Sequence, residues 1–272
     1  MGPIGLFDSG YGGLTILHQV RHLMPRYDYL YLGDNARAPY GPRSFDIVYE
    51  FTREAVMKLF DMGCHLVILA CNTASAKALR TIQQEDLPKL GDPTRRVLGI
   101  IRPTAEAIGN LTHSNHVGIC ATQGTINSQS YELEIKKFWP EIKVTGEPCP
   151  MWVPLVENNE YDSPGADYFV NKRIGNIMAA DPEIDSIILA CTHYPLLLNK
   201  ILKYVPRGVK VIPQGEFVAN SLQEYLQRHP ELDSLCSKNG ITHYMTTESP
   251  DKFKDSAQLF LHEEIEVEKI TL

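Results

Sequence analysis

The chain has 272 residues, of which 43% are hydrophobic and 22% charged, and its formal net charge is −7. This composition supports an ordinary hydrophobic core, while the acidic excess gives no basic surface for a nucleic acid or an anionic membrane. The sequence has no run of about 18 apolar residues that could span a bilayer, and its N-terminus lacks the pattern of a secretion signal. We therefore expect a cytoplasmic protein without membrane contact.

In chain order, short apolar runs alternate with longer amphipathic segments. Runs such as HLVILA (65–70) and SIILA (186–190) are apolar throughout, as buried strands of a parallel sheet are. Segment 44–63 carries apolar residues at three- and four-residue spacing, which predicts a helix. The alternation predicts an α/β fold with mostly parallel strands. The expected strands are 3–8, 28–33, 65–70, 116–121, 186–190, 209–212 and 241–245.

Two segments of the chain resemble each other. VILACNTAS (67–75) and IILACTHYP (187–195) each combine an apolar strand, Ala-Cys, polar residues and the start of a helix. This echo predicts two similar halves, each with a cysteine at the carboxyl end of a strand, where open α/β sheets bind ligands. Chance recurrence of a short string is the alternative. The expected domains are residues 1–98 together with 208–272, and residues 99–207.

Cys71 and Cys191 differ from the other cysteines in their setting. Each precedes the start of a predicted helix, where backbone N–H groups and the helix dipole favour a thiolate. Two opposed thiols suit the inversion of a carbon stereocentre, since one removes a proton while the other delivers one. The absence of CxxC gives no support for a zinc ribbon. Packing or an inert surface position is expected for Cys64, Cys120, Cys149 and Cys236.

Polar residues near these segments offer further chemistry. Asp8 ends the first expected strand, and it either points into a cleft or caps the helix that begins near Tyr11. The glycines of GLFDSGYGG (5–13) do not complete a dinucleotide motif, because Thr15 stands at the last position. His193 could bind a thiolate or a carboxylate, or be purely structural. The loop 33–41 could bring backbone donors and a phenol to a ligand.

The motifs IGLFDSGYGGL, GDNARAPYG, ACNTAS and ACTHYPLL occur in this order. Together they resemble glutamate racemases of the aspartate/glutamate racemase superfamily, from about residue 4 to residue 226. Weaker matches occur at ATQGTINSQSY (121–131) and PMWVPLVE (150–157). The resemblance implies two α/β domains with the active site in the cleft between them. It also implies interconversion of L- and D-glutamate without pyridoxal phosphate or any other cofactor, which supplies D-glutamate for peptidoglycan, and commonly a homodimer.

The resemblance also implies roles for individual residues. Cys71 matches the base that acts on D-glutamate, Cys191 matches the base that acts on L-glutamate, and Asp8 and His193 match the residues that assist them. The implied substrate-binding residues are Asp8, Ser9, Tyr40, Gly41, Asn72, Thr73, Thr192 and His193. Supporting roles are implied for Glu157, Thr122 and Thr125, and no metal ligands are implied. The sequence departs from the usual family pattern at Asn35, Ala38, Ala190 and Pro213.

Three other functions compete with this interpretation. An aspartate racemase is the nearest, but these tend to carry Glu after the second Cys-Thr, where this chain has His193. A non-catalytic regulator that binds a partner such as gyrase is disfavoured because both cysteines are present. A thiol hydrolase could use Cys with His and Asp, but it leaves the second cysteine without a role.

Overall fold

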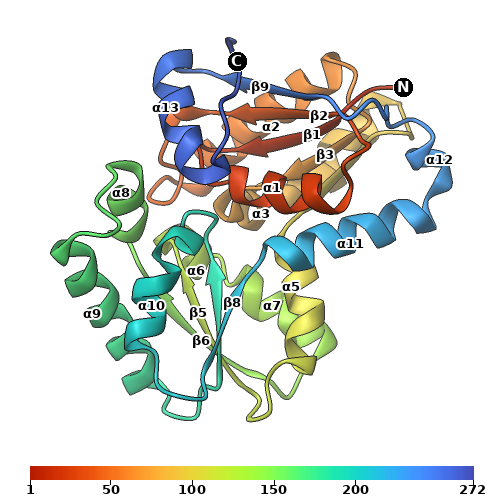
Figure 1. Cartoon of the computed structure of the whole chain (residues 1–272). Helices are drawn as coiled ribbons and strands as arrows, with labels where there is room; N and C mark the ends of the chain where they lie inside the picture. Colours follow the sequence, from red (N-terminus) through yellow and green to blue (C-terminus); the bar gives the residue numbers. More distant parts are fainter. The chain divides into compact units, whose positions relative to one another are not determined.

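The computed structural model describes residues 1–272, which divide into two compact units (Figure 1). The first unit comprises Met1–Ile100 and Gly215–Leu272, and the second comprises Ile101–Gln214. Each unit is built on its own sheet, and every pair of neighbouring strands is parallel. The predicted α/β class with parallel sheets is therefore confirmed. None of the helices is long and apolar enough to cross a membrane.

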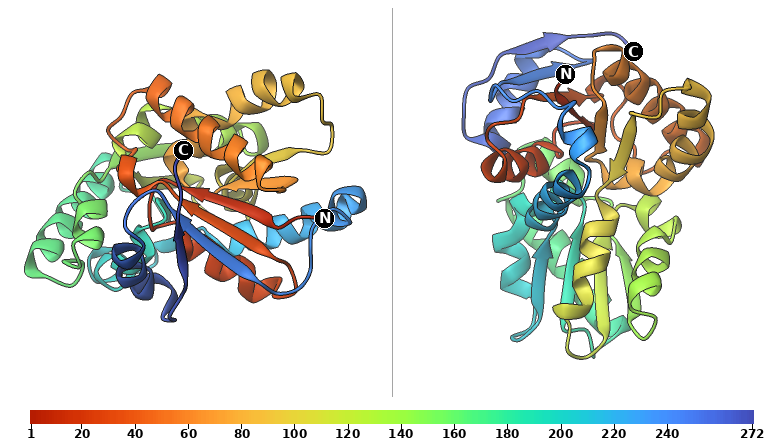
Figure 2. Two further views of the ribbon diagram at one scale, coloured as in Figure 1. Left: turned by 90° about the horizontal axis from the view of Figure 1, so that it is seen from above. Right: turned by 90° about the vertical axis from the view of Figure 1, so that its right-hand side faces the viewer.

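The first unit holds a six-stranded sheet in the order β10-β9-β2-β1-β3-β4. Its strands are β1 Ile4–Asp8, β2 Tyr29–Gly33, β3 Leu66–Leu69, β4 Arg96–Gly99, β9 Thr242–Thr246 and β10 Val267–Lys269. Its helices and turns are α1 Leu14–Leu23, η1 Asn35–Arg37, α2 Phe45–Asp61, α3 Asn72–Lys77, α4 Leu79–Thr81, η2 Ile82–Asp86, η3 Leu87–Leu90, α11 Gly215–Arg228, α12 Pro230–Asp233 and α13 Pro250–Leu261. Figure 2 shows α2 on one face of this sheet and α1 with α13 on the other.

The second unit holds a four-stranded sheet in the order β6-β5-β7-β8. Its strands are β5 His116–Ala121, β6 Lys143–Pro148, β7 Ser186–Ala190 and β8 Lys210–Pro213. Its helices and turns are α5 Ile101–Ala107, η4 Ile108–Asn110, α6 Gln123–Asn127, α7 Ser130–Phe138, α8 Trp152–Glu157, α9 Pro164–Ala180, η5 Tyr194–Leu197 and α10 Leu198–Tyr204. Helices α9 and α10 pack together on one side of the sheet, and α5 and α7 on the other (Figure 1).

All seven strands expected from the sequence occur, but three further strands were missed. These are β4, β6 and β10, and each lies at the edge of its sheet. Strand β6 has the sequence KVTGEP, and none of its residues is fully buried. Strand β10 has only three residues, two of them exposed. Because an edge strand has only one neighbour and is less covered, it needs no continuous apolar run, and the sequence gives little signal.

The assignment of residues 208–214 to the first domain was wrong. Strand β8 pairs with β7 in the second sheet, with Leu189 beside Pro213 in the register. Its sequence KVIP is as similar to the strands of the first sheet as to those of the second. The apolar pattern therefore could not indicate which sheet it joins. The return to the first unit therefore follows β8, at Gly215.

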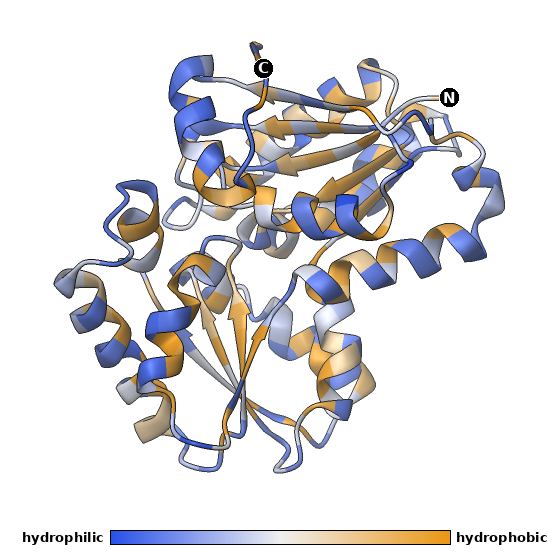
Figure 3. Ribbon diagram, viewed as in Figure 1, coloured by the Kyte–Doolittle hydropathy of each residue, from blue (hydrophilic) through white to orange (hydrophobic).

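The strands form the buried centre of each unit. Figure 3 shows hydrophobic residues concentrated in the strands and on one face of the surrounding helices. All five residues of β1, β2 and β7 are buried. Polar residues and two cysteines stand at or just after the carboxyl ends of β1, β2, β3, β5, β7 and β8, where the apolar runs stop. In the first unit these are Asp8, Asp34 and Cys71, and in the second unit Thr122, Cys191 and Gln214.

Candidate active site

Asp8, Ser9 and Cys71 meet at the carboxyl edge of the first sheet. Asp8 ends β1, and Cys71 follows β3, the strand that pairs directly with β1. The Ser9 Oγ atom lies 3.4 Å from the Cys71 Sγ atom. Asp8 and Cys71 are almost fully buried, with 1% and 6% of their surface exposed. The parallel pairing of two strands thus places a carboxyl, a hydroxyl and a thiol together.

Asp8 lies close to the start of the first helix. Helix α1 begins at Leu14 with Gly13 as its N-cap. The Asp8 Oδ1 atom accepts a hydrogen bond from the backbone N–H of Gly10 at 2.8 Å. Both roles that the sequence left open for Asp8, helix capping and a place in the site, therefore stay predictions.

Cys71 is itself the N-cap of helix α3. Its Sγ atom accepts a hydrogen bond from the backbone N–H of Ala74 at 3.4 Å. An N–H group directed at sulfur stabilises a thiolate more than a thiol. The next two residues, Asn72 and Thr73, form the buried first turn of the same helix. Asn72 and Thr73 therefore follow the thiol directly at the start of this helix, and their expected role in substrate binding stays a prediction.

The loop after β2 is organised by Asp34, which is fully buried. Its Oδ2 atom accepts hydrogen bonds from the Tyr40 hydroxyl at 2.5 Å and from Arg37 Nε at 2.7 Å. Its Oδ1 atom accepts one from the Thr247 hydroxyl at 2.9 Å. Burial and the charge of Asp34 raise the pKa of Tyr40. The Tyr40 hydroxyl is thus engaged by Asp34, and the expected binding of a ligand by Tyr40 and Gly41 stays a prediction, for which the peptide groups of this loop are the other available donors.

Cys191, His193 and Glu157 form a chain of interactions in the second unit. The Cys191 Sγ atom lies 3.9 Å from His193 Nδ1, and His193 Nε2 lies 3.1 Å from a Glu157 carboxylate oxygen. Burial alone would lower the pKa of His193, but its contacts with Cys191 and Glu157 outweigh this and raise the pKa to about 10. The imidazole is therefore held as a cation between a thiol and a carboxylate.

Threonines line the same edge of the second sheet. Thr122 follows β5 directly, and the register places its strand beside that of Cys191. The Thr122 hydroxyl accepts a hydrogen bond from the backbone N–H of Thr125, and the two hydroxyl oxygens are 3.1 Å apart. Thr192 is buried next to Cys191. Thr122 and Cys191 thus follow neighbouring strands at one edge of the sheet, and Thr192 is the next residue after the thiol.

The remaining four cysteines are packed inside the units. Cys64, Cys120, Cys149 and Cys236 are all buried and free. Burial raises the pKa of the Cys64 thiol to about 12 and that of Cys236 to about 11, and raises the pKa of Cys149 well above its usual value. Cys236 lies in a polar stretch of sequence, yet only 2% of it is exposed. Inert thiols of this kind fit the packing role that was expected.

Two buried polar side chains at the carboxyl ends of strands, Asp34 and Gln214, were not predicted from the sequence. Asp34 follows β2 just as Asp8 ends β1, and its position at a strand end was the available signal. Gln214 follows β8, and its Nε2 atom donates hydrogen bonds to the hydroxyls of Thr104 and Tyr131. No sequence pattern connects these three residues, since more than 80 residues separate Gln214 from either partner.

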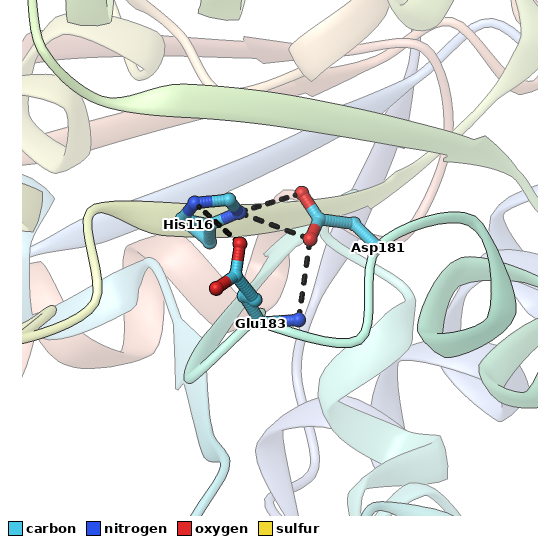
Figure 4. A group of neighbouring side chains, drawn as sticks. All are labelled: His116, Asp181 and Glu183. Atoms are coloured by element: carbon cyan, nitrogen blue, oxygen red, sulfur yellow. Dashed lines mark hydrogen bonds and ion pairs between the residues drawn. The ribbon is translucent and has the colours of Figure 1, made fainter.

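One further cluster of charged residues lies at the opposite, amino edge of the second sheet (Figure 4). His116 Nδ1 is 2.9 Å from an Asp181 carboxylate oxygen, and His116 Nε2 is 3.2 Å from Glu183. Lys143 Nζ also lies 3.1 Å from Asp181. Burial would raise the pKa of Asp181, but hydrogen bonds from His116 and Lys143 hold it at about 2. Both ring nitrogens of His116 thus face carboxylates. These four side chains form an ion-pair network that joins β5, β6 and the segment before β7.

The predicted residues are divided between the two units. In the first unit Ser9 lies against Cys71, Tyr40 belongs to the same core cluster as Cys71, and Asp8, Gly41, Asn72 and Thr73 are their neighbours in the chain. In the second unit His193 joins Cys191 to Glu157, Thr192 lies between Cys191 and His193 in the chain, and Thr122 contacts Thr125. The fold and the site together define a class of α/β protein with two units, each of which has a buried thiol beside a polar partner at the carboxyl end of a strand.

The comparisons with known proteins agree with this class. The family model for Asp/Glu/Hydantoin racemase matches residues 15–222. A glutamate racemase of Dinoroseobacter shibae is 37% identical over 97% of both chains. A solved glutamate racemase of Bacillus anthracis has a TM-score of 0.90 and 33% identity, covering 100% of this chain and 98% of that one. A glutamate racemase of Francisella tularensis, solved in complex with D-glutamate, has a TM-score of 0.87 and 32% identity, covering 99% and 97%.

The chain belongs to the Asp/Glu/Hydantoin racemase family, and it is an enzyme of the racemase class. The resemblance stated from the motifs is therefore confirmed.

Proposed function

We propose that this enzyme interconverts L-glutamate and D-glutamate by a two-cysteine acid–base mechanism that requires no cofactor. The observation that carries the proposal is the pair of buried thiols, Cys71 and Cys191, each at the carboxyl end of a strand and each beside its own polar partners. The relatives named above, which are glutamate racemases, support glutamate as the substrate.

In the D-to-L direction, the Cys71 thiolate removes the proton from the α-carbon of D-glutamate. The Cys191 thiol delivers its own proton to the opposite face of the same carbon, and L-glutamate results. Cys71 then carries the extra proton and Cys191 is the thiolate, so the L-to-D direction begins from this state. A proton is exchanged at carbon and none is lost, so each turnover begins with one sulfur ionised and the other protonated. The mechanism requires the groups of both units to face one substrate.

The polar partners have distinct tasks in this scheme. The His193 imidazolium stabilises the Cys191 thiolate and is itself held in place by Glu157. Beside Cys71, the Ser9 hydroxyl can donate a hydrogen bond to the thiolate, and Asp8 is buried at the end of the neighbouring strand β1. The negative charge that develops on the substrate carboxylate is stabilised by fixed donors. We assign this task to Asn72 and Thr73 and, in the second unit, to the donors around Thr192.

We further propose that the product D-glutamate serves peptidoglycan synthesis in the cytoplasm and that the enzyme is a homodimer. Glutamate is favoured over aspartate because His193 follows the second Cys-Thr and is bound by Glu157. The sequence and its net charge of −7 give no reason to expect a nucleic-acid partner.

The test is the decay of the circular-dichroism signal of L-glutamate and of D-glutamate, without pyridoxal phosphate. We expect both enantiomers to decay to the racemate. In the Cys71→Ser and Cys191→Ser variants we expect losses of about 100- to 10,000-fold, the usual contribution of a positioned acid or base. Full activity in either variant would contradict the two-base mechanism. Faster decay of aspartate than of glutamate would move the assignment to an aspartate racemase, and a covalent acyl-enzyme in the mass spectrum would indicate a thiol hydrolase.

A further inference from the structure

The loop that carries Tyr40 and Gly41 is held from within by Arg43. The guanidinium of Arg43 donates a hydrogen bond from Nη2 to the carbonyl of Arg37 at 2.7 Å and from Nε to the carbonyl of Pro39 at 3.3 Å. The guanidinium carbons of Arg37 and Arg43 also lie 4.0 and 5.4 Å from the ring centre of Phe51 on α2. The shape of this loop therefore depends on where Arg43 is fixed.

Arg43 is fixed in turn by a buried lysine. The Nζ atom of Lys77 donates a hydrogen bond to the backbone carbonyl of Arg43 at 2.6 Å. Only 9% of Lys77 is exposed, and its hydrogen bond goes to a neutral carbonyl and not to a carboxylate. Burial lowers the pKa of Lys77, which the nearby Cys71 partly opposes. Removing a charged ammonium from water is costly, so a lysine with one carbonyl partner at this position calls for an explanation.

The place of Lys77 in the fold supplies that explanation. Lys77 is the last residue of α3, the helix whose N-cap is Cys71 and whose first residues are Asn72 and Thr73. The carbonyl that it binds stands immediately before Ser44, the N-cap of α2. One side chain thus joins the helix that starts at the thiol to the far end of the substrate-binding loop, 34 residues earlier in the chain.

We propose that Lys77 is a positioning residue for substrate binding, which latches the loop 34–43 to helix α3. The latch keeps the peptide groups of Tyr40 and Gly41 in a fixed relation to Asn72 and Thr73. The inference concerns substrate binding and therefore rests on the proposed racemase function, although the latch itself can be measured without substrate. Because Lys77 sits at the opposite end of α3 from Cys71, its loss affects the affinity for glutamate more than proton transfer.

The experiment compares Lys77→Met with the wild type by hydrogen-exchange mass spectrometry and by steady-state kinetics. In the protein without substrate, we expect the amides of residues 36–43 to exchange about 10-fold faster in Lys77→Met, because the loop opens more readily. We expect KM for both glutamate enantiomers to rise about 10-fold, as for the loss of one hydrogen bond from a charged donor. We expect kcat to stay within about threefold of the wild type.

Two further variants make the comparison specific. Lys77→Arg keeps a cationic donor, and it should restore most of the exchange protection and of the affinity. Arg80→Met removes a positive charge from an exposed position three residues away, and it should leave both measurements unchanged. If Lys77→Met does not fold, Lys77→Gln removes the charge with a smaller change in polarity and takes its place.

Unchanged exchange and unchanged KM in the neutral variant would overturn the latch. A fall in kcat at constant KM would also overturn it, because Lys77 would then act on proton transfer. If the wild type does not racemise glutamate, the proposed function fails, and the latch is then decided by the exchange of residues 36–43 alone.

Discussion

At the scale of single residues, the site depends on polar groups that are buried and held by specific partners. Asp34 is an example of a buried carboxylate that needs hydrogen-bond donors from the protein. Its carboxylate accepts hydrogen bonds from Tyr40, Arg37 and Thr247, which belong to one loop and to the segment after β9. No water reaches a fully buried carboxylate, so these three donors replace the solvation that it loses on folding.

Asp34→Asn tests this arrangement because it keeps the shape and removes the charge. The amide can satisfy fewer of the three donors, and Arg37 loses one of its two carboxylate partners. We expect a loss of about 2 kcal/mol in the free energy of unfolding, from the weakened bonds to a charged group, together with a higher KM. Urea unfolding and glutamate kinetics measure the two effects. A variant as stable as the wild type, with the same KM, would show that the carboxylate does not organise the loop.

His193 should make the stability of the protein depend on pH in the alkaline range. The folded protein raises the pKa of His193 from 6.5 to about 10, so the folded state binds the proton more tightly than the unfolded chain. The stabilisation is complete below pH 6.5 and is lost as the pH rises towards 10. Relative to His193→Gln, we expect an advantage on the order of a few kcal/mol near pH 6 that shrinks steadily up to pH 10. Denaturant unfolding at several pH values checks it, and a difference that is constant with pH would contradict the assignment.

At the scale of helices and strands, the close approach of α1 to Asp8 depends on a glycine. A Cβ atom at Gly13 would lie 2.6 Å from the Cβ of Asp8 and 3.0 Å from the Tyr31 hydroxyl. Both neighbours are buried, so they cannot move aside without disturbing β1 or β2. The glycine-rich sequence after β1 therefore serves helix packing beside the carboxylate, and no nucleotide is needed to explain it.

Gly13→Ala should therefore reduce both stability and activity. We expect a loss of about 1–3 kcal/mol from overpacking and a fall in activity of about 10-fold or more, because a displacement of Asp8 costs the positioning of the reacting groups. Gly175→Ala is the matched control, since its new methyl group meets no atom within 4 Å inside helix α9. That variant should be slightly more stable by about 0.5–1 kcal/mol and fully active. Thermal unfolding and racemisation rates of the two variants settle the comparison.

The sequence predicted the elements with continuous apolar runs and the residues that directly follow them. Cys71 and Cys191 could be singled out because each follows an apolar strand and precedes polar residues. The expected helix starts directly after Cys71, whereas after Cys191 a short 3-10 helix starts only at Tyr194. The lysine latch and the Gln214 cluster could not be predicted, because each joins residues far apart in the chain. The assignment of β8 failed for a related reason, since strand pairing is decided by tertiary packing and not by the apolar pattern.

At the scale of the whole molecule, the proposed acid–base groups are divided between two units with separate sheets. Under the proposed mechanism each unit supplies one thiol and its partners, so neither alone would hold an acid–base pair for both faces of a substrate carbon. The consequence is that substrate binding should be felt in both units at once. A ligand that contacts the folded state of a segment suppresses the local opening of that segment, by the same linkage that raises global stability.

This coupling can be measured on a variant that binds without turnover. In the double variant Cys71→Ser, Cys191→Ser, we expect saturating D-glutamate to slow amide exchange in residues 72–77 of the first unit and in residues 192–197 of the second. Residues 232–237 bond to Gly2 and Asp28 at the amino ends of β1 and β2, at the edge of the sheet opposite Cys71, and they serve as the internal control, with no expected change. L-Glutamate should protect the same two segments, because both enantiomers occupy one site. Protection of only one segment would mean that a single unit binds glutamate, and the two-base mechanism would then lose its structural basis.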